Sequence, residues 1–136
     1  MSSWNPFKRK SSDDLGVTSI DPSEMSEPTD YESFMKRGWI HHARGNQDQA
    51  ESDFRRALIY SPESMDAYYA LGLVMKSMGN KDEAVKLFNK TMEMIKQGKI
   101  ADQSQSEMMR RLTLGHINEL TTGDWNLEDE IWHQSR

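Results

Sequence analysis

The chain of 136 residues contains no cysteine, and this absence excludes several kinds of site at once. A chain without thiols forms no disulfide, has no thiolate nucleophile and offers no cysteine ligand to zinc or an iron–sulfur cluster. The chain also lacks a hydrophobic run close to the roughly 18 residues that a membrane span needs. Its first residues show no apolar segment of a secretory signal. We therefore expect a soluble cytoplasmic protein.

The motifs of common catalytic sites are missing as well. There is no glycine-rich phosphate loop, no His-Glu-x-x-His pattern and no nucleophile elbow. The neighbouring His41 and His42 point about 100° apart on a helix and do not chelate one metal ion together. His116 and His133 have no partner near them in sequence. We predict a non-catalytic protein with no cofactor and no metal site.

A strongly basic segment is also absent. The net charge is −5, and the two ends are acidic: residues 1–30 carry 3 basic and 6 acidic side chains, and residues 99–136 carry 4 and 7. The segments 31–64 and 65–98 between them are close to neutral. Because affinity for nucleic acids comes mainly from counterion release at a dense basic face, we expect no nucleic-acid partner.

What the chain does contain is an internal repeat with a period of 34 positions. Two glycines, an alanine and a phenylalanine recur at this spacing, and a period of 20–50 residues is typical of stacked-repeat proteins. The recurring residues are Gly38, Gly45, Ala50 and Phe54 in the first copy, and Gly72, Gly79, Ala84 and Phe88 in the second.

Each copy has the pattern of two helices joined by a short turn. Bulky residues occupy one helical face before Gly45, and glycine at that place suits the left-handed turn that ends a helix. Asn46 with Gln49, repeated as Asn80 with Glu83, fits a capping box at the start of a second helix. A single hairpin of this kind buries too little apolar surface to be stable alone, so neighbouring hairpins are expected to stack.

The pattern predicts five helices in all, with Thr29 or Asp30 capping the first and Ser64 capping the third. Beyond Gly98 the repeat is lost, but an amphipathic pattern continues, and we expect its helix to cap the open end of the stack. The expected helices span about 31–44, 47–60, 65–78, 81–96 and 103–121.

The recurring residues resemble the tetratricopeptide repeats, whose pattern is an aromatic, Leu-Gly, Tyr, Ala, Phe, Ala and Pro at fixed offsets. The first copy departs from it at Arg37 and His41, which replace Leu and Tyr, and we expect His41 to fill the space between the helices. The second copy has Met75 for Tyr, Thr91 for the second Ala and Lys96 for Pro. The resemblance covers about half of the chain and implies an all-α superhelix with repeats at 31–64 and 65–98.

The resemblance also implies a concave groove lined by the first helix of each pair, whose facing residues lie one turn apart. Trp39 and Tyr69 are expected to matter most, because aromatic side chains often dominate binding energy at interfaces. Alternatively, either ring packs under one end of the chain. The complete groove set is Met35, Trp39, His42, Tyr69, Leu73 and Lys76.

Some members of the family grip the carboxylates of chaperone tails with a clamp of Lys, Asn and Arg. This chain does not match the clamp, because Met35 and Trp39 stand where Lys and Asn are expected. The groove is instead apolar and aromatic, which suits an amphipathic helix or a hydrophobic peptide.

The N-terminal arm, residues 1–30, is rich in Ser, Asp, Glu and Pro and is predicted to be disordered. Near its start, two aromatic residues precede three basic ones: Trp4, Phe7, Lys8, Arg9 and Lys10. Such a cluster binds an anionic membrane surface weakly and reversibly. The alternatives are that Asn5-Pro6-Phe7 acts as a peptide for EH domains, which it resembles, or that the cluster has no role.

The acidic C-terminal tail, residues 122–136, carries Trp125, Leu127, Ile131 and Trp132. Asn126 is placed to cap a short helix with acidic residues in its first turn, where they favour the helix dipole. One interpretation is that the tail folds back and completes the core. The other is that it docks into a partner protein or into a second copy of this chain.

These patterns favour a non-catalytic adaptor, scaffold or assembly factor. Its domain, residues 31–121, is expected to bind an apolar or helical peptide of a protein partner in the concave groove. Two alternatives remain open from the sequence. One is a self-assembling structural subunit that uses the tryptophan tail, and the other is an assembly factor held peripherally at a membrane by the aromatic and basic cluster.

Overall fold

The computed structural model describes residues 20–125, and residues 1–19 and 126–136 lie outside the described residues. Five α-helices follow a short 3₁₀ helix, and the described part of the chain contains no strand. Each α-helix agrees with the predicted one to within one residue at either end, which confirms the all-α fold. The further short helix expected after Asn126 falls outside the described residues. The elements are η3 (Pro22–Glu24), α1 (Tyr31–Ala43), α2 (Gln47–Tyr60), α3 (Met65–Ser77), α4 (Lys81–Lys96) and α5 (Gln103–Thr122).

Polar caps start most of these helices. Asp30, Ser64 and Asp102 each accept a hydrogen bond from the backbone N–H three residues ahead, at 2.8, 3.1 and 2.8 Å. Asn80 does the same toward Glu83 at 3.4 Å, as the capping box predicts. Each of these bonds satisfies a backbone N–H that lacks a partner within its helix.

The capping box predicted at Asn46 is wrong. The Asn46 side chain makes no cap hydrogen bond. Its Nδ2 atom lies 3.5 Å from Nδ1 of His41, which stands where the tetratricopeptide pattern has a tyrosine. The glycine before it behaves as expected, because Gly45 adopts a φ of 82°, a left-handed conformation that costs residues with a Cβ more than it costs glycine.

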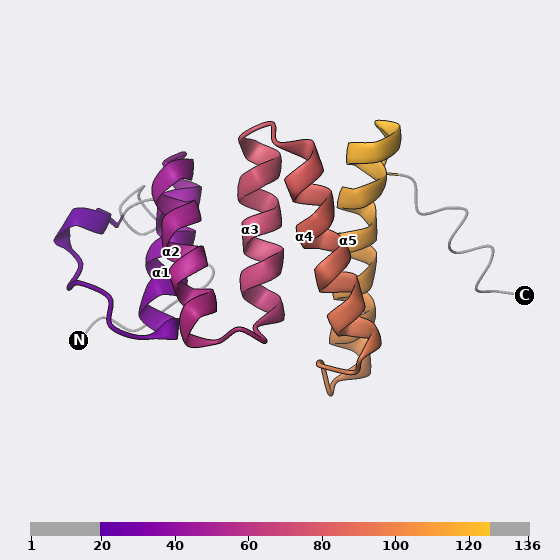
Figure 1. Cartoon of the computed structure of the whole chain (residues 1–136), viewed down its shortest axis with the longest axis horizontal. Coiled ribbons are helices and arrows are strands. Elements are labelled where there is room, and N and C mark those ends of the chain that lie inside the picture. The colour runs from indigo at the N-terminus through magenta and orange to yellow at the C-terminus, as the bar shows by residue number, and fades with distance from the viewer. Residues whose placement is uncertain (1–19, 126–136) are drawn as a thin grey trace, which may run out of the picture.

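The helices stand side by side in chain order (Figure 1). α1 packs on α2 and α3 packs on α4, which gives two hairpins, and α2 packs on α3 to join them. α5 then packs on α4 as α3 packs on α2. The fifth helix therefore occupies the place of the first helix of a third hairpin.

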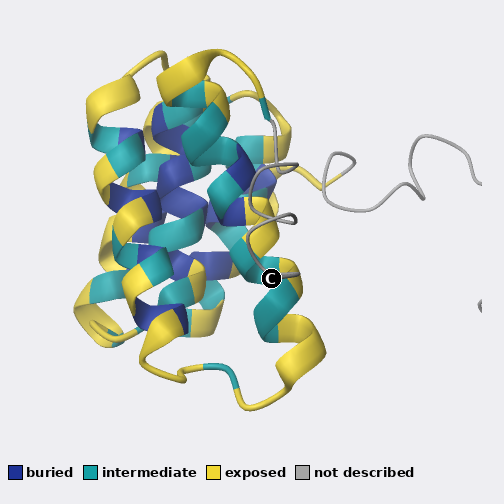
Figure 2. Ribbon diagram, turned by 90° about the vertical axis from the view of Figure 1, so that its right-hand side faces the viewer, coloured by how far each residue is buried: buried dark blue, intermediate teal, exposed yellow. Residues whose placement is uncertain are grey.

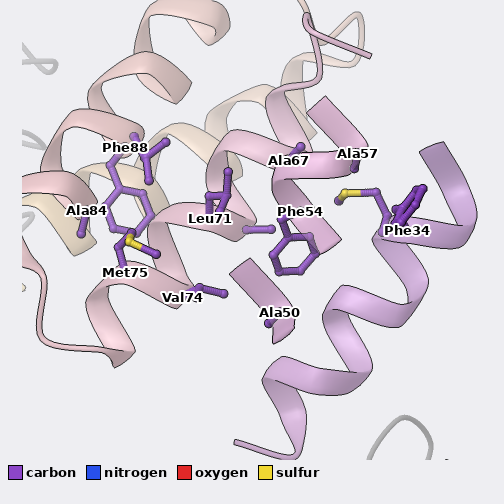
Figure 3. Packing of buried hydrophobic residues seen from close by; sticks show 13 residues of the cluster. Phe34, Ala50, Phe54, Ala57, Ala67, Leu71, Val74, Met75, Ala84 and Phe88 are labelled. Atoms are coloured by element: carbon purple, nitrogen blue, oxygen red, sulfur yellow. The ribbon is translucent and has the colours of Figure 1, made fainter. Parts of the chain in front are cut away.

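The core runs through the centre of the stack, and the buried positions gather on the inner sides of the helices (Figure 2). Phe54 and Phe88 are completely buried, each within its own hairpin (Figure 3). A Cβ atom added to Gly38 would lie 2.6 Å from the Phe54 ring, and one added to Gly72 would lie 2.6 Å from the Phe88 ring. Each phenylalanine thus fills a space that only a glycine on the facing helix leaves open.

The described part of the N-terminal arm, residues 20–30, lies against α1. The side chain of Arg44, at the end of α1, donates a hydrogen bond of 3.1 Å to the carbonyl oxygen of Ile20. Glu27 lies 3.5 Å from Arg37 in the middle of the helix. Although the sequence predicted no structure in residues 1–30, this part contains the η3 turn and a buried Pro22.

Candidate functional site

A pocket of about 430 Å³ lies between α1, α3 and α5. Met35, Trp39 and Tyr69, three of the six residues predicted to face a groove, line it together. The remaining lining residues come from the first turns of α1 and α3 and from α5: Tyr31, Glu32, Asp66 and Met109.

The two aromatic walls of the pocket stand on the core phenylalanines. Trp39 meets Phe54 edge to face, with ring centroids 5.2 Å apart. Tyr69 lies at 5.8 Å from Phe88 in a tilted arrangement, and burial raises the pKa of its hydroxyl. Because the phenylalanines are held by the hairpins, the walls are positioned by the repeat structure itself, and binding a ligand there would need little ordering of side chains.

Two carboxylates stand at the rim of the pocket. Glu32 and Asp66 occupy equivalent places, one period of 34 residues apart, and both are exposed. Neither forms an ion pair with another residue of the described part, and no cationic side chain lines the pocket. The pocket therefore combines an apolar interior with a negatively charged edge.

The other three predicted groove residues do not line this pocket. His42 lies 2.8 Å from the side-chain oxygen of Gln47. Leu73 is partly buried against the core. Lys76 is paired with Glu119 of α5 at 3.0 Å, so its charge is engaged within the protein.

His116 of α5 contacts residues of α3 and α4, although it has no partner near it in sequence. Its ring stacks on Phe88 with centroids 5.0 Å apart. Nε2 lies 3.2 Å from the Tyr69 hydroxyl, and Lys76 donates to Nδ1 at 3.0 Å. Burial, with the nearby Lys76 charge, lowers the pKa of His116 to about 4, against the opposing effect of Glu119. The ring is therefore neutral at pH 7, and its Nδ1 atom accepts a hydrogen bond from the Lys76 ammonium group. Its partners lie 40 and 47 residues away, a separation that local patterns do not reveal.

Trp125, the last described residue, packs on α5. Its ring meets His116 at 4.8 Å, and Asn118 donates a hydrogen bond of 3.3 Å to its carbonyl oxygen. A Cβ atom added to Gly115 would overlap the Trp125 indole. The contact repeats the pairing of glycine with an aromatic ring seen in both hairpins. The other predicted tail residues, Leu127, Ile131 and Trp132, lie outside the described residues.

The aromatic and basic cluster predicted near the start of the arm lies before the first described residue. All of its members lie outside the described residues: Trp4, Phe7, Lys8, Arg9 and Lys10.

A buried ion pair lies in the first hairpin, on residues that sequence reasoning did not join. Nε and Nη2 of Arg37 each lie 2.8 Å from an oxygen of the buried Asp53. The pair raises the pKa of Arg37, and His41 stands 3.9 Å from the same carboxylate with a pKa lowered mainly by burial. The sequence did contain a signal for this ion pair. Arg37 and Asp53 have opposite charges, and both occupy positions of the repeat that face the core.

No group of three or more His, Asp or Glu side chains within residues 20–125 has the arrangement of a metal site. In the same part of the chain, no helix is both long and apolar enough to cross a membrane.

Comparison with known families finds two matches, both described as tetratricopeptide repeat. One family model matches residues 31–64 and the other matches residues 66–93. The matched ranges correspond to the two hairpins, α1 with α2 and α3 with most of α4. No curated protein and no solved structure matches the chain.

Proposed function

The chain belongs to the tetratricopeptide-repeat family, with two repeats. From this membership we propose that it is a cytoplasmic, non-catalytic adaptor that binds an apolar or helical peptide of a partner protein in the concave pocket. Domains of this family generally mediate contacts between proteins. The proposal adds the place of binding and the chemistry of the peptide.

The observation that carries the proposal is the pocket formed by both repeats. Its volume of about 430 Å³ falls within the range of natural ligand pockets. Trp39 comes from the first repeat and Tyr69 from the second, so a peptide anchored between them would contact both units. Aromatic side chains held in place by packing are the residues that most often carry binding energy at protein interfaces.

Substitution of the two pocket residues Trp39 and Met109 by alanine tests this proposal. Trp39 comes from α1 and Met109 from α5, so the two variants probe opposite walls. We expect both to lose the proteins that crosslink to the wild-type chain in cell extract, identified by mass spectrometry. Circular dichroism must show that each variant keeps its helices.

Ile59→Ala is the matched control, because Ile59 is 76% exposed and lies outside the pocket. This variant should retain the crosslinked proteins. If Trp39→Ala and Met109→Ala retain them as well, the pocket is not the binding site.

Self-assembly through the tail is a second candidate that depends on the apolar tail residues of the sequence, because Trp125 itself packs on α5 of its own chain. In this case the Trp125 and Trp132 segment of one copy would occupy the groove of the next. Mass measurement over a concentration series tests it with the wild-type chain and with Trp132→Ser. A mass equal to one chain at every concentration rules out self-assembly.

Membrane recruitment through the aromatic and basic cluster of the arm remains a further proposal that depends on the sequence alone. It predicts salt-sensitive binding of the full chain to vesicles that contain anionic lipid. Replacement of Lys8, Arg9 and Lys10 by glutamine should abolish that binding. Equal binding of both proteins would contradict the proposal.

A further inference from the structure

The rim of the concave pocket is acidic on the side formed by the first turns of α1 and α3. Glu32 and Asp66 are both exposed there, and the corresponding place on α5 is taken by the uncharged Met109. An occupant that puts an apolar side chain against Trp39 and Tyr69 therefore brings its flanking groups close to two carboxylates. Complementary charge at such a rim favours basic flanking residues and disfavours acidic ones.

The chain itself contains a segment of this composition. Trp4 and Phe7 are followed directly by Lys8, Arg9 and Lys10, so aromatic anchors and positive charges occur within seven residues. The tail offers the opposite charge, because Glu128, Asp129 and Glu130 separate its apolar residues. Of the two ends of the chain, the N-terminal one matches the pocket in both apolar character and sign of charge.

The position of Ile20 brings this segment within reach of the pocket. The Ile20 carbonyl accepts a hydrogen bond from Arg44, the C-cap residue directly after α1. Trp39 lies on α1 five residues before Arg44, about 7.5 Å along the helix axis. The ten residue-to-residue steps from Lys10 to Ile20 span up to about 33 Å when extended, which is ample to pass round the end of α1.

We propose that the segment from Trp4 to Lys10 occupies the concave pocket of its own chain. Its aromatic side chains lie against Trp39 and Tyr69, and its basic residues lie beside Glu32 and Asp66. Tethering gives such a segment an effective concentration on the order of millimolar, so even weak intrinsic affinity keeps the pocket filled. An external peptide must then displace the arm, which makes the arm a built-in competitor.

The test uses a fluorescent peptide with the sequence of residues 1–12, titrated into the full chain and followed by anisotropy. We expect weak binding to the wild type, whose pocket is occupied. Binding should become at least about tenfold tighter when Trp4→Ser and Phe7→Ser together release the pocket, because a tethered competitor is removed. Equal affinity for both proteins, or no binding to the released chain, would overturn the proposal.

The acidic rim is tested in the released chain by Glu32→Gln and Asp66→Asn, which remove charge with little change of shape. We expect about a tenfold loss of peptide affinity at low salt and a smaller loss at high salt, where charges are screened. The matched control is Asp82→Asn with Glu93→Gln on α4, two exposed carboxylates outside the pocket. An equal loss from the control, or no loss from the rim variant, contradicts the role of Glu32 and Asp66.

Mass measurement of the wild-type chain separates two sources of the segment. A mass of one chain across the concentration range supports occupation by its own arm. A dimer that dissociates when Trp4 and Phe7 are replaced assigns the segment to a second copy and overturns the intramolecular form. The inference does not depend on the proposed adaptor function, because the peptide assay uses no outside partner. If the crosslinking experiment fails, the result of the peptide assay is not affected.

Discussion

The two repeats have the same helical framework but fill their hairpins with different chemistry. In the second repeat three core positions hold apolar residues, whereas the equivalent positions of the first repeat hold two basic residues and an acid. The equivalent pairs, 34 residues apart, are Arg37 and Leu71, His41 and Met75, and Asp53 and Leu87. The charged set occurs in a single unit, so the difference is not a property of the fold.

The location of the charged set explains how it is tolerated. The first hairpin has no described unit in front of it, and the arm lies there instead, with Glu27 at 3.5 Å from Arg37. The Arg37 side chain remains 20% exposed, so water solvates part of the guanidinium. Desolvation is the main cost of a buried ion pair, and partial access of water reduces that cost. The second hairpin lies between α2 and α5, where no such access exists for Leu71, which is fully buried.

The feature that both repeats share should give the largest effects. Phe54→Ala and Phe88→Ala each remove a fully buried ring, so each should lower the free energy of unfolding by about 3–5 kcal/mol. Urea unfolding followed by circular dichroism measures both. If Phe54→Ala lowers the free energy of unfolding by less than half as much as Phe88→Ala, the first repeat is more loosely packed than the second. The two repeats would then differ in packing as well as in charge.

The charged set itself should give the next largest effect. Asp53→Ala leaves Arg37 without its bidentate partner, and we expect a loss of about 3 kcal/mol, at the low end for a broken buried pair because water reaches the arginine. The same urea unfolding experiment measures this loss.

The matched control for the ion pair is the triple change Arg37→Leu, His41→Met and Asp53→Leu, which gives the first repeat the core of the second. It should be neutral or stabilising, since well-packed apolar residues often replace buried ion pairs at no cost. A triple variant less stable than Asp53→Ala would mean that the two hairpins are not equivalent in shape.

The glycine contacts extend the comparison to α5. Gly72→Ala forces a Cβ against the buried Phe88, and we expect a cost of about 1–3 kcal/mol. Gly115→Ala meets Trp125, which is only partly buried and can move aside, while alanine favours the helix by about 1 kcal/mol. Its net effect on the thermal midpoint should be close to zero. A cost equal to that of Gly72→Ala would show that Trp125 is held as firmly as a core residue.

The last prediction depends on pH and concerns the position that holds Trp39, Leu73 and His116 in the three units. The folded-state pKa of His116, about 4, lies below the ordinary value of 6.5, so the unfolded chain takes up a proton first as the pH falls. Its contribution to stability is complete above pH 6.5 and declines toward pH 4. We expect a decline of about 1–2 kcal/mol, because solvent reaches the half-buried ring and reduces the full effect of the shift.

Unfolding free energies at several pH values measure this slope, and His116→Gln should flatten it. If His116→Gln leaves the slope unchanged, other groups cause the loss of stability in acid.

The fold could be predicted because its determinants are local or periodic. Recurrence of glycine, alanine and phenylalanine gave the hairpins, and Asp30 and Ser64 marked helix starts that the structure confirms. The capping box at Asn46 was predicted wrongly because the local sequence does not reveal that the side chain of His41 competes for the Asn46 side chain. Asp53 was missed because a lone carboxylate in an amphipathic pattern is normally solvated, and only its place relative to Arg37 distinguishes it.

The pocket was accessible to sequence reasoning only in part. Met35, Trp39 and Tyr69 follow from their spacing on the two first helices, and the structure brings them together. Glu32 and Asp66 are 34 residues apart, so their spacing indicated equivalent places in the two repeats. The net charge of each whole segment does not reveal this, because basic residues elsewhere in each segment cancel its acidic residues. Met109 had no signal of this kind, because its position depends on how α5 stacks on α4.

The place of α5 gives the molecule an architecture that can change in length. The first hairpin, with its charged core positions, suits the first place in the stack of helices, and the Gly115–Trp125 contact covers part of the last helix. The apolar second hairpin packs against a neighbouring helix on both sides. A duplicate of residues 65–98 inserted between α4 and α5 would find matching surfaces before and after it. Gene duplication could therefore lengthen the stack one hairpin at a time, with the first hairpin and α5 kept as they are.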